Sequence, residues 1–184
     1  MVTKEQGKKL LKLARESIKN SFSGKKTDIA PYKEFSKKQG VFVTLNLRGN
    51  LRGCIGYPEP IMPLNKAIVD AARAAAFSDP RFPSLEKWEF EKMKIEISVL
   101  TVPERIDVKD YSQYLKEIKI GEDGLIIRSE WGSGLLLPQV FTEYDCDVKK
   151  ALEMLCQKAG LEPNEWRNLD NKIFKFQAQI FSEQ

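Results

Sequence analysis

The sequence predicts an α+β protein in which helices pack on an antiparallel or mixed β-sheet. β-prone segments follow one another as hairpins, and amphipathic helical segments stand between them without the strand–helix–strand rhythm of a parallel sheet. The chain has 184 residues, of which 42% are hydrophobic and 30% charged. A globular chain of this length can bury one core, or one core with a smaller attached subdomain, without metals or disulfides.

The first third of the chain predicts a helix followed by a hairpin. Residues 3–20 carry apolar and small side chains at helical spacing on one face. Five basic side chains fall on the opposite face, namely Lys4, Lys8, Lys12, Arg15 and Lys19. Residues 41–48 and 51–57 are β-prone, and they are divided by Gly49-Asn50. Because that dipeptide tolerates the positive φ of a two-residue turn, these segments predict a hairpin.

The middle of the chain predicts a buried helix and a half-exposed strand. An apolar helix of small residues begins after Pro63 and stops by Asp79-Pro80, since the residue before a proline is pushed out of helical geometry. Residues 94–100 alternate between apolar and polar side chains. This alternation places Ile95, Ile97 and Val99 inward, and Glu96 and Ser98 on the other face.

The last third predicts a second hairpin, a capped helix and a closing strand. Residues 118–120 and 125–127 are expected to pair through the turn between them, and residues 135–137 to form a further strand. A helix begins at Asp145 or Asp147 and ends before Gly160. Residues 173–181 alternate and are expected to close the chain as one strand.

The composition excludes several classes of site. The chain contains no histidine, which removes Ser-His-Asp and Cys-His catalysis and histidine-based zinc sites. Its cysteines, Cys54, Cys146 and Cys156, lack metal-ligand spacing, so we expect free thiols and no metal site. No apolar run suits a membrane span or a secretory signal, and we expect a cytoplasmic protein. The net charge of +4 is mild and does not by itself favour nucleic acid.

Residues 51–56, Leu-Arg-Gly-Cys-Ile-Gly, are the strongest candidate for a functional site. The glycines that flank Cys54 weaken a strand interior, so they indicate a bulge or the close approach of another backbone or a ligand. With the turn at the Gly-Asn dipeptide, Arg52 lies opposite Leu47 and Cys54 opposite Leu45, and both side chains project from one face. A guanidinium beside the thiol favours the reactive thiolate, whereas aliphatic neighbours make the thiol an inert packing residue.

Three further features have both a functional and a structural interpretation. The basic stripe of the first helix can contact phosphate, but such a stripe is more often a solvated face. The rigid turn that begins Asp79-Pro80-Arg81 can bind an anion through Arg81, although the sequence favours a charge pair that fixes the loop. Cys156 is in helical register with Leu152 and is expected in the core.

The chain resembles the AMMECR family, whose archaeal and bacterial members are called AmmeMemoRadiSam system protein A. The six-residue segment with Cys54 is the hallmark of this family, and the other matching segments follow in order along the chain. The matching segments are residues 40–45, 51–56, 79–82, 97–100, 124–127, 135–140 and 158–161. Relatives often carry tryptophan near the position of Cys146, so we expect no shared role for that thiol.

The resemblance implies one domain over residues 1–184 with a two-subdomain α+β fold. A smaller α/β subdomain is expected beside a larger one that holds both chain ends, with the hallmark near a groove. The family name implies partners, a Memo-type protein and a radical S-adenosylmethionine enzyme, but no reaction or cofactor. The candidate catalytic residues are Cys54 and Arg52. The candidate binding residues are Gly53, Gly56, Arg81, Glu96, Ser98 and Gln139.

Three functions follow from these residues. In the first, the hallmark builds a groove that binds a small-molecule ligand or acts on it, with Cys54 as nucleophile, Arg52 holding its thiolate or an anionic substrate, and Glu96 or Ser98 assisting proton transfer. In the second, the protein is a docking or scaffold partner of the associated enzymes. In the third, which the sequence favours least, the basic helix binds RNA. The sequence specifies no substrate, cofactor or oligomeric state.

Overall fold

The computed structural model describes residues 2–184, and these residues form two compact units. Unit 1 comprises the chain as far as Leu100 together with Gln179–Gln184, and unit 2 comprises Thr101–Ala178. Each unit has its own four-stranded sheet and its own cluster of buried apolar side chains. None of the helices in residues 2–184 has the length and apolar character that crossing a membrane requires.

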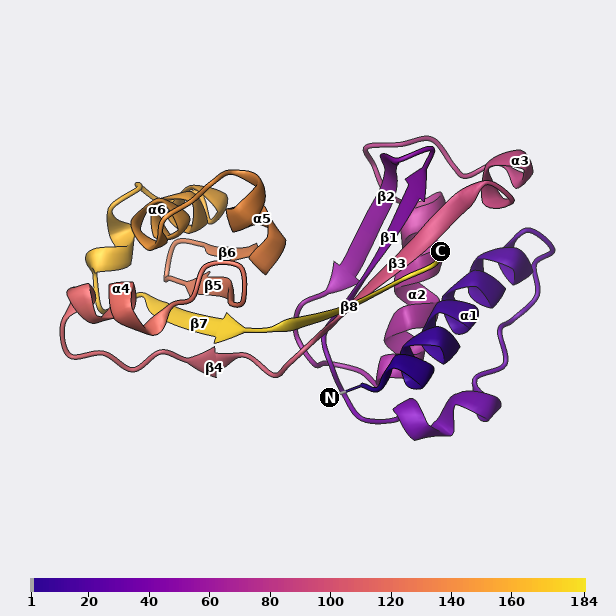
Figure 1. Cartoon of the computed structure of the whole chain (residues 1–184), viewed down its shortest axis with the longest axis horizontal. Coiled ribbons are helices and arrows are strands. Elements are labelled where there is room, and N and C mark those ends of the chain that lie inside the picture. Colours follow the sequence, from indigo (N-terminus) through magenta and orange to yellow (C-terminus); the bar gives the residue numbers. More distant parts are fainter. Residues whose placement is uncertain (1) are drawn as a thin grey trace. The chain divides into compact units, whose positions relative to one another are not determined.

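Unit 1 consists of a sheet in the order β2-β1-β3-β8 with two long helices on one of its faces (Figure 1). Its helices are α1 (Lys4–Ser21), the 3-10 helix η1 (Ala30–Phe35), α2 (Leu64–Phe77) and α3 (Lys87–Phe90). Its strands are β1 (Val41–Leu47), β2 (Asn50–Tyr57), β3 (Met93–Leu100) and β8 (Ala178–Ser182). Strand β1 is antiparallel to both β2 and β3.

The two long helices confirm the sequence prediction. Thr3 caps α1 with a capping box to Gln6, and the predicted apolar face of α1 is fully buried. The lysines of the opposite face are exposed as expected, whereas Arg15 is only partly exposed. Helix α2 ends before Asp79-Pro80 and packs on β1 and β2 with a nearly continuous run of buried alanines. The helices therefore cover one face of the sheet.

The predicted register of the first hairpin is wrong. The turn residues are Arg48 and Gly49, with φ values of 52° and 82°, one position earlier than the Gly-Asn dipeptide. Pairing continues from this turn until a bulge leaves Arg52 without a partner residue on β1. Beyond the bulge Cys54 pairs with Thr44 instead of Leu45. Both dipeptides contain the glycine that such a turn needs, so the sequence did not determine which one forms it.

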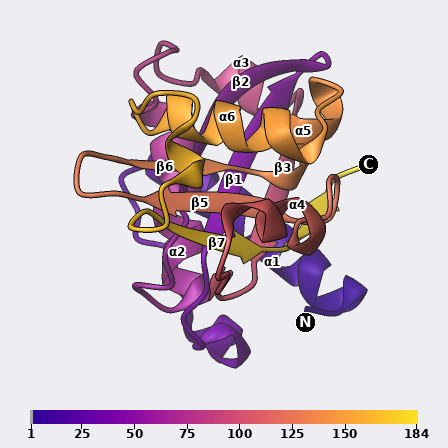
Figure 2. The same ribbon diagram turned by 90° about the vertical axis from the view of Figure 1, so that its left-hand side faces the viewer.

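Unit 2 consists of a sheet in the order β4-β7-β5-β6, with α5 and α6 packed on it (Figure 2). Its strands are β4 (Glu104–Arg105), β5 (Gly124–Arg128), β6 (Ser133–Leu136) and β7 (Lys172–Phe176). Its helices are η2 (Tyr111–Gln113), α4 (Tyr114–Glu117), α5 (Pro138–Glu143), α6 (Val148–Lys158) and η3 (Glu165–Arg167). Of the two caps that the sequence allowed, Asp145 and Asp147, it is Asp147 that caps α6, and Gly160, at a φ of 75°, follows the end of this helix as predicted.

Two strand predictions in this part of the chain are wrong. Residues 118–120 are not a strand, because Ile118 caps α4 and the following residues turn toward β5. Strand β5 pairs instead with β6 and β7. The closing strand is divided at Gln177, whose backbone N–H and C=O both bond to Thr101. Residues 172–176 consequently belong to the sheet of unit 2, and residues 178–182 to the sheet of unit 1.

Candidate functional site

Arg52 is buried in an ion pair that turns it away from the thiol. Its Nε and Nη2 donate to the two carboxylate oxygens of Glu89 on α3 at 2.7 and 2.9 Å, and Nη2 also donates to the carbonyl of Ser84 at 3.3 Å. The hydrogen bonds from Arg52 hold the pKa of Glu89 below its usual value. The expectation that Arg52 and Cys54 project from one face is therefore wrong, because the bulge at Arg52 shifts the register between them.

The hallmark glycines allow neighbouring backbones to approach closely. A Cβ atom at Gly53 would lie 2.1 Å from the carbonyl oxygen of Ala75 on α2. At Gly56 it would lie 2.3 Å from the carbonyl oxygen of Val41 on β1. The predicted bulge and close approach are both present, and the approaching group is the protein's own backbone. These two candidate binding residues thus have a structural role within unit 1.

Asp79 and Arg81 hold the outer edge of β2 at Cys54. Strand β2 is an edge strand, and its Cys54 N–H donates to Asp79 Oδ2 at 2.9 Å while its Cys54 carbonyl accepts from Arg81 Nη2 at 3.1 Å. Arg81 also binds both oxygens of Asp79, at 3.0 and 2.8 Å. The Arg81 guanidinium, together with the backbone N–H groups, holds the pKa of the buried Asp79 carboxyl well below its usual range. We call this three-residue arrangement the edge clamp.

The Cys54 side chain lies on the face of the sheet that α1 and α2 do not cover, which we call the outer face. The inner face carries Val43, which belongs to the core cluster and pairs with the next residue of β2, Ile55. The Cys54 thiol is partly exposed, and the Thr44 hydroxyl donates to its Sγ at 3.3 Å. The hydrogen bonds of Arg52 go to Glu89 and Ser84, and the arginine that interacts with the thiol is Arg81. The neighbour of the thiol in the pairing is a hydroxyl.

The two candidates on β3 differ in their surroundings. Glu96 pairs with Thr44 across β1 and β3, so it belongs to the same polar row as Cys54. Its carboxylate, however, accepts from the Ser182 hydroxyl at 2.9 Å, on the strand at the far side of β3. Ser98 was expected on a half-exposed face, but it is 2% exposed. Since adjacent strands are roughly 4.8 Å apart, Glu96 and Cys54 are separated by about twice that distance.

Comparison with known proteins decides the family. A family model described as AMMECR1 matches residues 11–181. The chain belongs to the AMMECR1 family. A protein of Methanothermobacter thermautotrophicus is 44% identical, with 99% of this chain and 96% of that protein covered. Protein MJ0810 of Methanocaldococcus jannaschii is 48% identical, with 100% of this chain and 92% of that protein covered.

A solved structure shows the same fold as this AMMECR1-family chain. The crystal structure of the uncharacterized protein PH0010 from Pyrococcus horikoshii matches it with a TM-score of 0.91 and 42% sequence identity. The match covers 100% of this chain and 94% of that chain. The resemblance to this family and the α+β fold expected from the sequence are both confirmed, and the relatives compared here are archaeal.

The remaining candidate and the other two thiols of this AMMECR1-family protein lie in unit 2. Gln139 is in the first turn of α5, and its side-chain oxygen is buried without a hydrogen-bond partner among residues 2–184. Cys156 is fully buried on α6 as expected, and burial raises the pKa of its thiol to about 11. Cys146 is 8% exposed. No group of three or more potential metal ligands occurs in the described part of the chain.

Sequence reasoning missed two residues of the site. Thr44 would have been found only from the earlier turn and the bulge together, because the turn alone sets Val43 opposite Cys54 and the bulge moves the pairing to Thr44. Glu89 could not be found from the local sequence, because it lies 37 positions after Arg52 and pairs with it only in the folded chain. Asp79 and Arg81 form the loop-fixing pair that the sequence favoured, and the backbone they also hold is that of the hallmark.

Proposed function

We propose that this AMMECR1-family protein is a ligand-binding module in which the Cys54 thiol and the Thr44 hydroxyl contact a small polar molecule on the outer face of unit 1. The edge clamp carries this proposal. It fixes the backbone of Cys54 on both sides, and it leaves the side chain partly exposed. A rigidly held strand with a free polar side chain is typical of a preorganised binding site.

Binding fits the surroundings of Cys54 better than catalysis does. A cysteine nucleophile needs a base or a cation to hold its thiolate. The chain has no histidine, Arg52 is engaged with Glu89, and the Glu96 carboxylate is engaged with Ser182. Arg81 donates to the Cys54 carbonyl and also interacts with the Cys54 side chain, but its guanidinium is already paired with both oxygens of Asp79. The polar groups beside the thiol therefore suit recognition of a ligand.

Native mass spectrometry tests the proposal. Wild-type protein and a Cys54→Ala variant are each incubated with a small-molecule extract of an archaeal relative. We expect wild type to retain a ligand that Cys54→Ala loses, and we expect the melting temperatures of the two proteins to be similar. Cys146→Ala, which removes a thiol of unit 2, is the control and should retain the ligand. Retention by Cys54→Ala would contradict the proposal. Conversion of an extract component that depends on Cys54 would favour the enzyme.

A docking role is the second candidate. It is supported by a basic groove on unit 1, described below, whose floor is apolar. The Memo-type and radical S-adenosylmethionine proteins implied by the family resemblance remain predicted partners. Affinity measurements with each purified protein would test that prediction.

A further inference from the structure

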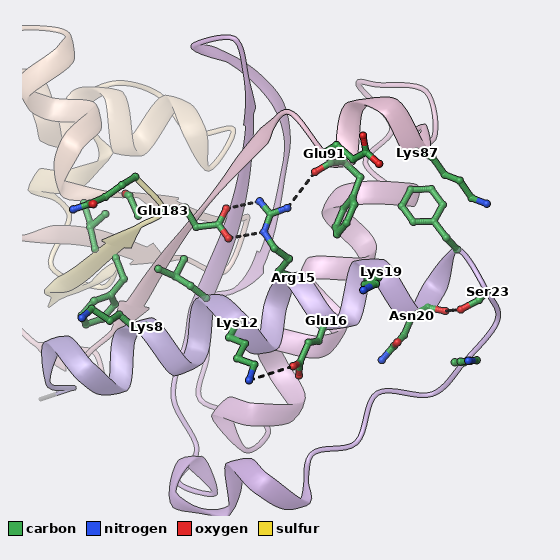
Figure 3. A pocket seen from close by; sticks show the side chains of 18 of the residues that line it. Lys8, Lys12, Arg15, Glu16, Lys19, Asn20, Ser23, Lys87, Glu91 and Glu183 are labelled. Carbon is green, nitrogen blue, oxygen red and sulfur yellow. Dashed lines mark hydrogen bonds and ion pairs between the residues drawn. The ribbon is translucent and has the colours of Figure 1, made fainter.

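A groove of about 1470 Å³ lies on unit 1 beside α1 (Figure 3). It is lined by the basic side of α1, the segment that follows this helix, α3 and β8. It is distinct from the Cys54 site, because its lining includes none of the clamp or hallmark residues. The inference drawn from it therefore does not depend on the ligand site proposed above.

One basic side chain of the groove is committed to holding unit 1 together. Arg15 Nε donates to Glu183 Oε1 at 2.6 Å, and the Arg15 Nη groups donate to the carbonyls of Phe90 and Met93 at 3.1 and 3.0 Å. Glu183 also accepts from the N–H of Ile95. Figure 3 shows the paired guanidinium and carboxylate between α1 and the end of the chain. These groups build the groove wall and are not free for a partner.

The other basic side chains leave the groove strongly positive. Seven basic and three acidic side chains line it. Arg15 and Glu183 neutralise each other, which leaves six basic and two acidic side chains. Lys8 and Lys12 form only exposed pairs, with Glu5 and Glu16. The rest are exposed and have no acidic partner among residues 2–184. They are Lys4, Lys19, Lys25 and Lys87.

The floor between these lysines is apolar. Phe22 and Phe90 contact each other edge to face, with ring centroids 5.8 Å apart, near the α3 end of the groove. Leu11, Ile180 and Phe181 complete the floor. Ile180 is 48% exposed on the edge strand β8, so a partner can reach it. The groove thus combines an apolar floor with a cationic rim.

We propose that this groove docks an acidic amphipathic helix of a partner protein. The lysines recur along α1 from Lys4 to Lys19, a span of about 22 Å at 1.5 Å per residue. A partner helix of about four turns has the same length. Its apolar stripe would cover Ile180 and the phenylalanine floor, and its carboxylates would meet the lysine rim.

The floor favours a peptide over nucleic acid. A single strand of RNA is held by exposed aromatic faces on which bases stack. Here Phe22, Phe90 and Phe181 are only partly exposed and pack against the core of unit 1. An amphipathic helix has an apolar face for this floor, which a phosphate backbone lacks.

Fluorescence anisotropy with a synthetic helix tests the proposal. The probe is a labelled peptide of about 16 residues with leucine at i, i+3, i+4 and i+7 and with glutamate and alanine elsewhere. We expect it to bind at low salt and to weaken as salt is added. A peptide of the same composition in scrambled order, and one with glutamine in place of glutamate, should each bind at least about tenfold more weakly.

Matched variants locate the binding surface. Lys19→Glu, Lys25→Glu and Lys87→Glu together should weaken the peptide at least about tenfold. The control is Lys33→Glu, Lys37→Glu and Lys38→Glu, which makes the same charge change at exposed positions outside the groove. Ile180→Ser should also weaken binding, whereas Ile61→Ser should not, since Ile61 is equally apolar, 57% exposed and outside the groove. If charge reversal disturbs folding, the same lysines are replaced by glutamine and the comparison is repeated.

Three results would overturn the proposal. The first is no binding of the glutamate peptide at low salt. The second is equal weakening by the two lysine triples, which would indicate unspecific attraction to a basic protein. The third is tighter binding of a labelled oligouridylate than of the peptide, with no effect of Ile180→Ser, which would assign the surface to nucleic acid.

Discussion

At the scale of single residues, the backbone and the side chain of Cys54 each have polar partners. Its N–H and carbonyl are bound by Asp79 and Arg81, and its thiol accepts from the hydroxyl of Thr44 and also interacts with the Arg81 guanidinium. The charged residues of the hallmark region thus stabilise strand β2. What the thiol does chemically depends on the molecule that binds beside it. Each of these residues can be substituted separately.

Asp79→Asn should destabilise the protein by about 2 kcal/mol at neutral pH, because it weakens a buried carboxylate that accepts several charge-assisted hydrogen bonds. The folded-state pKa of Asp79 lies below the ordinary value of 3.8. Its contribution is therefore full above that pH and is lost as the pH falls through the folded value. Urea unfolding at several pH values should show the difference between wild type and variant narrowing below about pH 4.

A matched control is Asp107→Asn. Asp107 also pairs with an arginine, Arg105, at 2.9 Å, but the two side chains are 78% and 49% exposed. Its loss should change stability by less than about 0.5 kcal/mol. A constant difference between wild type and Asp79→Asn across the acidic range would contradict the assignment.

Arg52→Met should destabilise the protein by about 3 kcal/mol, because it leaves the buried Glu89 carboxylate without its cation. Glu89→Leu should have a comparable effect. The double variant should be more stable than the sum of the two single effects predicts, since it leaves neither charge alone. Urea unfolding of all four proteins measures this coupling, and simple additivity would show that the pair does not act as a unit.

At the scale of elements, β2 is an edge strand held from two sides. The edge clamp occupies its outer backbone groups at Cys54, and α2 lies against Gly53 from the inner face. Exposed strand edges invite pairing with other chains, and a short charged clamp prevents it at this point. The main structural role of the hallmark is therefore to join β2, α2 and the turn after α2.

Gly53→Ala should strain this junction, because the added Cβ would lie 2.1 Å from a backbone carbonyl that cannot move without α2. We expect a loss of about 2 kcal/mol or more, measured as a lower melting temperature by circular dichroism. Gly49→Ala is the control, since it has open space around it and only the positive φ to accommodate, at a cost of about 1 kcal/mol. Equal effects of the two variants would contradict the close approach.

The elements were predictable from the sequence where periodicity was long. Helices α1 and α2 and strand β3 follow from spacing alone, whereas the sequence left the cap of α6 open between Asp145 and Asp147. The turn before β2 was displaced by one residue, and the bulge at Arg52, which the predicted register left out, moved Arg52 and Cys54 relative to each other. The strand prediction for residues 118–120 failed because a three-residue segment with two apolar positions carries too little periodic signal. The partners Glu89 and Thr44 required the tertiary fold.

At the scale of the molecule, unit 2 is continuous in sequence and unit 1 is not. Unit 2 has its own core, which includes Phe141, Leu152 and Trp166. Residues 101–178 expressed alone should therefore fold cooperatively, since a core of this kind can support a small domain. We expect a sigmoidal thermal transition by circular dichroism.

Tryptophan fluorescence provides an independent measurement on this fragment. Trp131 is 83% exposed and Trp166 is 2% exposed, so Trp131→Phe leaves a buried reporter. Its emission should be blue-shifted in the folded fragment and should shift red in the same transition. Leu152→Asp, which places a charge in the core, should abolish both signals of folding. Red-shifted emission from the parent fragment would mean that unit 2 needs the rest of the chain.

The divided sheet of unit 1 also sets an order of events during synthesis on the ribosome. Strand β3 is complete at Leu100, but its neighbour β8 comes from residues 178–182, after the whole of unit 2 has been translated. Until then β3 is an edge strand of the nascent chain, and Arg15 lacks the Glu183 carboxylate. Domains usually fold in the order in which they emerge. In this chain unit 1 begins to emerge first, but its sheet is completed last. The nascent protein is therefore most prone to aggregate along the unpaired edge of β3.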